Sequence, residues 1–272
     1  MYDMLIRGGT VVDGTGSKPF RADVAVCGGK IAAVAETITP ERAEKLVDAA
    51  GMIVAPGFID MHAHSDLTVL KGRSGANVLE QGITMEVTGH CGESVTPPIK
   101  EMKRAVDSDD ISKIERIEAN GGTLRALLQE LKECPPPTNM AFFIGHGNLR
   151  AKVMGYADRR PTEEELERMR ALLRAEMEAG ALGMSTGLIY PPGSYADTNE
   201  LVELAKVAAA YGGIYSSHIR SEGDRLVESV EEAIKIGRRA GLRFWCHTTR
   251  CPAEGTAARA CRHLHSSHRR TR

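Results

Sequence analysis

Two histidines two positions apart offer the first chemistry in this sequence. His62 and His64 stand in GFIDMHAHSD, directly after an apolar segment. Residues i and i+2 of an extended chain face the same side, so the two imidazoles are expected to project together. Imidazole is the commonest protein ligand for metal ions. The pair therefore predicts a metal site, and the alternative is two polar residues that only end a strand.

Other side chains that bind metals follow further apolar segments. Cys91 lies in VTGHCGES, in a glycine-bounded loop where a thiolate can bind or bridge zinc, whereas a structural cysteine would lie within an apolar run. His90 beside it is interpreted as a neighbour of the site. His146 in FIGHGNLR and His218 in YSSHIRSE each end an apolar segment. One such histidine is commonly a core residue, but several together indicate a shared site.

The secondary-structure elements that must position these residues change near residue 54, from short strands alone to strands that alternate with helices. Residues 3–54 read as short strands, with Gly28-Gly29 marking a hairpin. Beyond them, short apolar segments alternate with helical patterns such as residues 162–180, which Thr162 begins and Gly180 ends. This alternation predicts βα units and a parallel sheet. The candidate residues then fall at the strand ends where a (β/α)8 barrel carries its active site.

The bulk composition excludes several classes of function. The chain has 272 residues, 42% hydrophobic and 26% charged, with a formal net charge of -1. This balance predicts a globular protein that binds neither nucleic acid nor an anionic membrane. No apolar run approaches the roughly 20 residues that span a bilayer, and no signal-peptide pattern begins the sequence. Of the six cysteines, Cys27, Cys91 and Cys134 are scattered without framework spacing, which adds to the expectation of a cytoplasmic protein, and the other three crowd into the last 28 residues.

Five blocks of sequence together resemble the N-acyl-D-amino-acid deacylases (D-aminoacylases) of the amidohydrolase superfamily. They are APGFIDMHAHSD, VTGHCGES, GHGNLR, GALGMSTGLIYPPGSYADTNEL and GGIYSSHIRSEGD, and the resemblance runs from residue 1 to about 243. It implies an incomplete TIM-type (β/α)8 barrel of about five βα units, preceded by a small β-sandwich module. The expected division is a β module over 1–54, a partial barrel over 55–243 and an aberrant tail over 244–272.

The resemblance also implies a set of site residues. The implied ligands of one or two zinc ions are His62, His64, Cys91 and His218. Tyr190 matches a substrate-pocket tyrosine, and the alternative is packing of its ring on the two prolines that follow. Arg220 is a candidate for binding a substrate carboxylate through two hydrogen bonds. The alternative for Arg220 is an ion pair with Glu222.

The activity implied is zinc-dependent hydrolysis of the amide bond of small-molecule N-acyl-D-amino acids. The family uses an aspartate after the eighth strand as general base, so no catalytic residue is assigned within this chain. Cyclic amidases such as dihydroorotases and hydantoinases share the histidine pair but are expected to carry a carbamylated lysine where this chain reads MSTGLIYPPG. A barrel that binds without catalysing is a third hypothesis. The acyl group, the D-amino acid and the oligomeric state stay open.

The last segment departs from the family pattern. Residues 245–272 hold three Cys, four His and six Arg but one Leu, which predicts neither a strand nor an amphipathic helix. A zinc knuckle is disfavoured because the segment has no CxxC pair. Read one base earlier, the codons for Phe244, Trp245 and Cys246 encode an apolar residue, Leu and Val. The following codons permit Ser-His-His-Lys, which the resemblance leads us to expect after the sixth strand.

These features suggest that residues 244–272 are a frameshifted tail. His247 would then be no metal ligand, despite its position. A parallel barrel that stops after five strands leaves two open edges and an uncovered interior. We therefore expect this chain to be unstable or prone to aggregation, and inactive.

Overall fold

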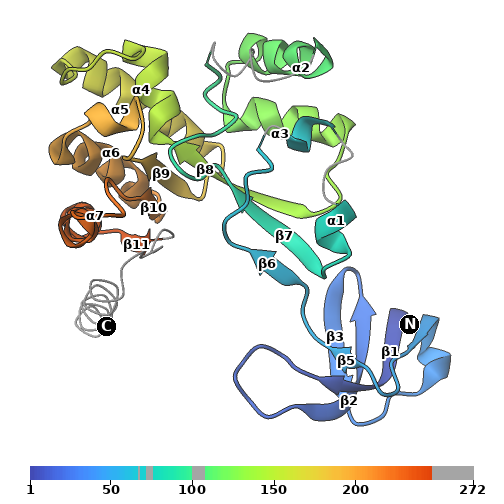
Figure 1. Ribbon diagram of the computed structural model, residues 1–272. Helices are drawn as coiled ribbons and strands as arrows, with labels where there is room; N and C mark the ends of the chain where they lie inside the picture. Colours follow the sequence, from blue (N-terminus) through green and yellow to red (C-terminus); the bar gives the residue numbers. More distant parts are fainter. Residues whose placement is uncertain (67, 72–75, 100–107, 247–272) are drawn as a thin grey trace. The chain divides into compact units, whose positions relative to one another are not determined.

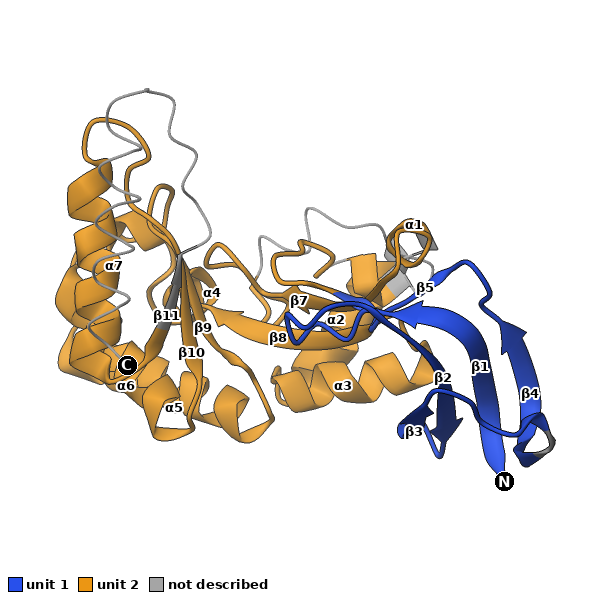
Figure 2. Cartoon of the chain, turned by 90° about the horizontal axis from the view of Figure 1, so that it is seen from below, with its two compact units in different colours: residues 1–58 blue, residues 59–272 orange. Residues whose placement is uncertain are grey.

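The computed structural model in Figure 1 describes residues 1–66, 68–71, 76–99 and 108–246. The chain divides into two compact units, Met1–Phe58 and Ile59–Arg272, which are blue and orange in Figure 2. The boundary expected from the sequence falls after residue 54. Most of the tail for which a frameshift is hypothesised, residues 247–272 with His247 among them, lies outside the described residues.

The first unit is built on one β-sheet. Its strands are β1 (Tyr2–Val11), β2 (Phe20–Cys27), β3 (Lys30–Ala35), β4 (Ala43–Asp48) and β5 (Ile53–Val54), with the 3-10 helix η1 (Pro40–Arg42) before β4. The strand order is β3-β2-β1-β4, and β5 also pairs with β1. β1 runs antiparallel to β2 and parallel to β4 and β5. A β module is thus confirmed, although its described strands form a single sheet where a sandwich was expected.

The hairpin predicted at Gly28-Gly29 is confirmed. β2 and β3 pair in antiparallel fashion on either side of the two glycines. Gly28 has a φ of 58° and Gly29 a φ of 72°. Two-residue hairpin turns need this left-handed conformation at both positions, and glycine adopts it without steric cost.

The second unit is built on a curled sheet that resembles part of a barrel (Figure 1). Its strands are β6 (Phe58–Asp60), β7 (Ile83–Thr88), β8 (Asn139–Gly145), β9 (Gly183–Gly187), β10 (Ile214–His218) and β11 (Arg243–Cys246). They lie in sequence order from β6 to β11, and neighbours from β7 onward pair in parallel. Strands that pair in parallel and in sequence order are the arrangement of a (β/α)8 barrel. The predicted fold class is confirmed.

One expectation about the tail is wrong. The composition from Trp245 onward predicts no strand, yet Arg243–Cys246 form β11, in parallel register with Ile214 to Ser217 of β10. Pairing along a strand edge joins backbone groups, so it does not depend on the composition of the segment that follows. The sheet of the second unit therefore has six strands where five were expected.

Helices follow the strands of the second unit in alternation. They are η2 (Thr68–Lys71), α1 (Ala76–Leu79), α2 (Ser108–Ala119), α3 (Leu124–Glu133), α4 (His146–Met154), α5 (Glu163–Glu178), η4 (Gly193–Tyr195), α6 (Thr198–Ala210) and α7 (Leu226–Ala240). The predicted start of α5 is confirmed, since Thr162 and Glu165 cap each other's backbone N–H groups. Asp197 caps α6, and α7 ends at Gly241 with a φ of 74°.

The apolar faces of these helices pack on the sheet and form the main core. The core includes one fully buried residue from each of α4 to α7 and from β8, β9 and β10: Leu149, Leu173, Leu204, Ile236, Ile144, Met184 and Tyr215. Every helix in the described ranges is too short or too polar to cross a membrane. Because the helices return the chain to the same end of the sheet, the loops after successive strands lie together at the carboxyl ends of the strands. The candidate residues lie in these loops.

Candidate metal centre

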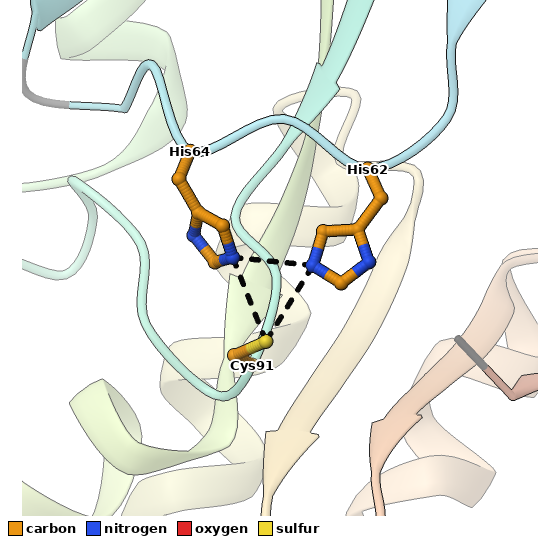
Figure 3. A group of neighbouring side chains, drawn as sticks. All are labelled: His62, His64 and Cys91. Carbon is orange, nitrogen blue, oxygen red and sulfur yellow. Dashed lines mark hydrogen bonds between the residues drawn. The ribbon is translucent and has the colours of Figure 1, made fainter. Parts of the chain in front are cut away.

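The segment after β6 presents both histidines of the HxH pair. The Asp60 carboxylate accepts a hydrogen bond from the His62 backbone N–H at 3.0 Å. The N–H of the intervening Ala63 donates to the Val87 carbonyl of β7 at 2.9 Å, and the Ala63 side chain is buried. This backbone anchoring fixes the segment beside β7. The two imidazoles then point the same way, as Figure 3 shows.

Cys91 reaches the same point from the loop after β7. His62 Nε2 and His64 Nε2 lie 3.1 Å apart, and Cys91 Sγ lies 3.6 Å from each of them (Figure 3). In the parts of the chain that the structure describes, these three residues form the one group whose donor atoms all lie within 4.8 Å of one another. The structure thus brings together three of the four predicted metal ligands.

The separations in this group fit a zinc ion. Tetrahedral zinc with bonds of about 2.05 Å to nitrogen and about 2.3 Å to sulfur holds two nitrogens about 3.3 Å apart, and nitrogen and sulfur about 3.6 Å apart. The observed separations of 3.1, 3.6 and 3.6 Å match these values closely. Two imidazoles and a thiolate are also a preferred zinc donor set. The residues present therefore fit the metal that the sequence implies.

The surroundings of His62 favour the protonation state that binds a metal. Burial, followed by the neighbouring His64, holds the pKa of His62 below its ordinary value. A neutral imidazole has the free lone pair that a metal needs. Burial raises the pKa of the Cys91 thiol, so in the absence of a cation this thiol keeps its proton. Metal binding at this site would release that proton.

Neighbouring residues link the two loops that carry the group. The Asp66 carboxylate accepts from the Gly89 backbone N–H at 2.5 Å, and burial raises the pKa of Asp66 to about 7. The His90 ring stacks on His62 with centroids 4.4 Å apart, and its Nδ1 lies 3.1 Å from Ser216 Oγ. His90 thus supports His62 and lies outside the group of three, in agreement with its interpretation as a neighbour.

His218 lies near the group without joining it. Its Nε2 is 3.2 Å from a carboxylate oxygen of Glu222, and its ring meets Tyr190 edge-on with centroids 5.5 Å apart. Burial is the main reason that the pKa of His218 lies below its ordinary value, and the nearby His64 adds to the effect. His218 therefore faces the site from β10, and its role as a ligand remains a prediction.

Tyr190 is half-buried and contacts the cysteine loop. Its hydroxyl donates to the Cys91 carbonyl oxygen at 2.6 Å. It also lines a small cavity together with Cys91, Glu93 and Asn148. Neither of the two predicted roles, in a substrate pocket or packed on prolines, includes this hydrogen bond, which joins Tyr190 to the backbone of a candidate metal ligand.

Arg220 makes contacts within the fold. Its guanidinium donates to the Glu232 carboxylate at 2.9 and 3.1 Å and to the carbonyl oxygens of Ser194 and Ala196 at 2.9 Å each. The ion-pair partner expected from the sequence, Glu222, is wrong, because Glu222 lies beside His218 instead. With these bonds Arg220 holds α7 against the segment around η4.

His146 does not join the site. It begins α4, is fully buried, and donates from Nε2 to Glu200 at 2.9 Å. The other oxygen of Glu200 accepts from the buried Arg150 at 2.5 Å. These three residues connect α4 to the start of α6. The expectation that each histidine after a strand serves one shared site is therefore wrong for His146.

Two residues that the sequence did not single out prove important to the site. Asp66 links the HxH segment to the cysteine loop, and its place two residues after His64 is the signal that could have marked it. Ser185 of β9 bonds the same loop. A serine within a strand of small residues carries no comparable signal.

Comparisons with known proteins cover the same region. A model of the amidohydrolase family matches residues 45–233, which include every candidate site residue. A D-aminoacylase from Alcaligenes xylosoxydans xylosoxydans is 40% identical over 242 residues, which are 87% of this chain and 48% of that enzyme. The chain thus spans about half the length of this relative.

Solved structures agree with this match. An N-acyl-D-glutamate deacylase from Bordetella bronchiseptica, complexed with zinc and a phosphonate mimic of the tetrahedral intermediate, superimposes with a TM-score of 0.81 at 34% identity, over 99% of this chain and 56% of that one. A D-aminoacylase described for its binuclear metal centre gives a TM-score of 0.80 at 35% identity, over 90% of this chain and 51% of that one.

Proposed function

Because the chain belongs to the amidohydrolase family, we propose that the whole protein hydrolyses the amide bond of N-acyl-D-amino acids at a zinc centre. The convergence of His62, His64 and Cys91 at zinc-ligand separations is the observation that carries this proposal. Relatives described as a D-aminoacylase and an N-acyl-D-glutamate deacylase support the substrate class. The products would be a carboxylate and a D-amino acid.

In this proposal the two histidines and the cysteine would hold one zinc ion, and His218, which faces them from β10, would serve as a further ligand of one or two ions. Bound zinc lowers the pKa of a water ligand to about 7 and polarises the scissile carbonyl. His62 contributes a neutral imidazole, because burial lowers its pKa. Cys91 contributes a thiolate and gives up its proton when the metal binds. The general base is expected from an aspartate after the eighth strand of the family barrel.

Of the two candidate substrate-binding residues, Tyr190 and Arg220, we retain one. Tyr190 is retained as a residue of the substrate pocket, because it is half-buried and lines a cavity beside Cys91. Arg220 is not retained, because its guanidinium already binds Glu232 and two backbone carbonyls. Binding of a substrate carboxylate by Arg220 would require these bonds to break.

The proposed activity is tested with protein expressed from the complete gene. We expect zinc-loaded enzyme to release D-amino acids from N-acetyl-D-amino acids and to leave the L enantiomers intact. Chelation should abolish turnover, and added zinc should restore it. Ring opening of hydantoin or dihydroorotate, without hydrolysis of N-acetyl-D-amino acids, would instead identify a cyclic amidase.

We further propose that a frameshift near codon 243 produced the sequence from residue 244 onward, and that this chain alone is inactive. The support is the composition of residues 245–272, together with the apolar-Leu-Val and Ser-His-His-Lys sequence that the displaced frame allows. Resequencing the source DNA from codon 235 onward tests it. A missing base, with a histidine and a later aspartate in the restored frame, is the expected result. An intact frame without family-like sequence downstream would contradict the proposal.

A cytoplasmic location is also proposed. Cys27, Cys91 and Cys134 are free thiols. A reducing compartment preserves free thiols, including one that must bind a metal. Recovery of the native protein in an oxidising compartment after cell fractionation would contradict this location.

A further inference from the structure

The loop that presents Cys91 has an unusual backbone. Gly89, Cys91 and Gly92 have φ values of 78°, 57° and 76°. Cys91 is the one non-glycine residue with positive φ in the ranges that the structure describes. Such a conformation is disfavoured for a residue with a side chain, and it persists where the surroundings impose it. The direction of the Cys91 thiol therefore depends on what holds this loop.

The end of β9 packs closely against the loop. A Cβ atom placed on Gly92 would lie 2.6 Å from the Gly187 backbone nitrogen. A Cβ atom on Gly187 would overlap the Cys91 carbonyl oxygen. The two backbones therefore touch directly, and glycine at both positions allows the approach. A side chain of β9 can then bond the loop.

Ser185 of β9 forms a hydrogen bond at each end of the loop. Its hydroxyl donates to the Gly89 carbonyl oxygen at 2.5 Å and accepts from the Gly92 N–H at 3.1 Å. Ser185 is fully buried, so water does not compete for either group. One hydroxyl thus bridges the two residues that flank His90 and Cys91.

We infer that Ser185 is a positioning residue, which holds the Cys91 thiolate where it can share a metal ion with His62. The inference rests on the proposed function of the site. Without the hydroxyl, the loop loses the bridge that opposes its strain, and Cys91 can relax to negative φ. That rotation carries Sγ away from the two imidazoles. The three donors would no longer meet at the separations that suit zinc.

The test compares cobalt binding by the protein expressed from the complete gene and by two serine variants of it. Cobalt replaces zinc in such sites, and a bound thiolate gives it a charge-transfer absorption in the near ultraviolet. Ser185→Ala removes the bridge, whereas Ser217→Ala is the matched control. Ser217 is an equally buried serine on the adjacent strand, and its hydroxyl accepts from Thr186 at 3.0 Å. Circular dichroism of each metal-free variant reports on its fold.

We expect S185A to bind cobalt about 10- to 100-fold more weakly than the parent protein, with reduced thiolate absorption. S217A should match the parent. In a Cys91→Ala background, S185A should cause no further loss, because Ser185 acts through Cys91. Parent-like affinity and absorption in S185A would overturn the inference. So would an S185A protein that is unfolded without metal, since the hydroxyl would then support the fold as a whole. Failure of the parent protein, expressed from the complete gene and folded by circular dichroism, to bind cobalt would instead overturn the proposed function.

Discussion

At the scale of single residues, the sequence predicted which side chains meet but not what holds them. His62, His64 and Cys91 could be predicted because metal-binding residue types stand directly after strands. Ser185 could not, since a hydroxyl occurs everywhere in protein sequences, and Asp66 carried a signal only in its place two residues after His64. The Ser185 contact with Gly92 joins residues 93 positions apart, so it exists only in the folded chain.

Loss of the Cys91 thiol should weaken zinc binding most. We predict that Cys91→Ala lowers zinc affinity by more than about 100-fold, above the usual effect of losing a neighbour of a metal ligand. Competition with a chromophoric chelator measures the affinity. Cys27→Ser is the matched control, because Cys27 is a free, exposed cysteine in the first unit. Equal losses in the two variants would contradict the role given to Cys91.

A buried carboxylate away from the site should make stability depend on pH. Glu176 of α5 accepts from the Leu124 N–H at 2.6 Å and from Thr96 Oγ1 at 3.2 Å. Burial raises its pKa from 4.5 to about 7. Between these two values the folded state holds a proton that the unfolded state has lost. The free energy of unfolding therefore falls as pH rises through this window.

Glu176→Gln should remove the part of this dependence that Glu176 contributes. We predict that the variant has a shallower slope than the parent between about pH 5 and pH 7, with the remaining slope coming from Asp66, whose pKa burial also raises to about 7. Above this range it should be more stable than the parent by on the order of 3 kcal/mol. Urea unfolding across this range measures the effect. Glu178→Gln, an exposed change on the same helix, is the control. Parallel pH profiles of parent and E176Q would show that Glu176 ionises normally in the fold.

At the scale of elements, local signals predicted most of the fold. Thr162 and Gly180 mark the ends of α5 through capping chemistry, and Gly28-Gly29 marks a turn through positive φ. Each of these features is decided within a few residues of chain. The strand at Arg243–Cys246 was missed because the composition from Trp245 onward is not that of a strand, whereas the pairing with β10 joins backbone groups. Glu200, the buried partner of His146, lies far away in sequence, which is why His146 was grouped with the site.

The buried network of α4 and α6 should matter more to stability than a surface ion pair. Glu200→Ala leaves the fully buried Arg150 without its carboxylate, which should cost about 3–5 kcal/mol. Glu130→Ala breaks an ion pair with the largely exposed Arg116 and should change stability little. Urea denaturation of both variants measures their changes in unfolding free energy. Equal changes would mean that the buried network adds nothing beyond a surface pair.

At the scale of the whole molecule, the proposed metal site should couple folding to metal binding. The three donors come from two separate loops, which meet only when β6 and β7 lie side by side in the sheet. The unfolded chain cannot offer them together, so zinc should bind the folded state preferentially. The regular alternation of strands and helices predicted that both loops lie at the same end of a barrel, whereas the separations between the three donor atoms required the structure.

Zinc should therefore stabilise the chain. At a free zinc concentration of about 100 times its dissociation constant, the gain in unfolding free energy should be about 2.7 kcal/mol. Thermal unfolding with and without zinc measures it, and chelator should reverse the effect. Magnesium, which prefers oxygen ligands, is the control. The same unfolding temperature in zinc and in chelator would contradict coupling between this site and the fold.

X-ray absorption at the zinc edge of the zinc-loaded chain tests the central claim, a zinc centre made by His62, His64 and Cys91, most directly. We predict one sulfur neighbour at about 2.3 Å with nitrogen or oxygen neighbours at about 2.0–2.1 Å, and loss of the sulfur signal in Cys91→Ala. A zinc environment of nitrogen and oxygen alone in the parent chain would contradict the account.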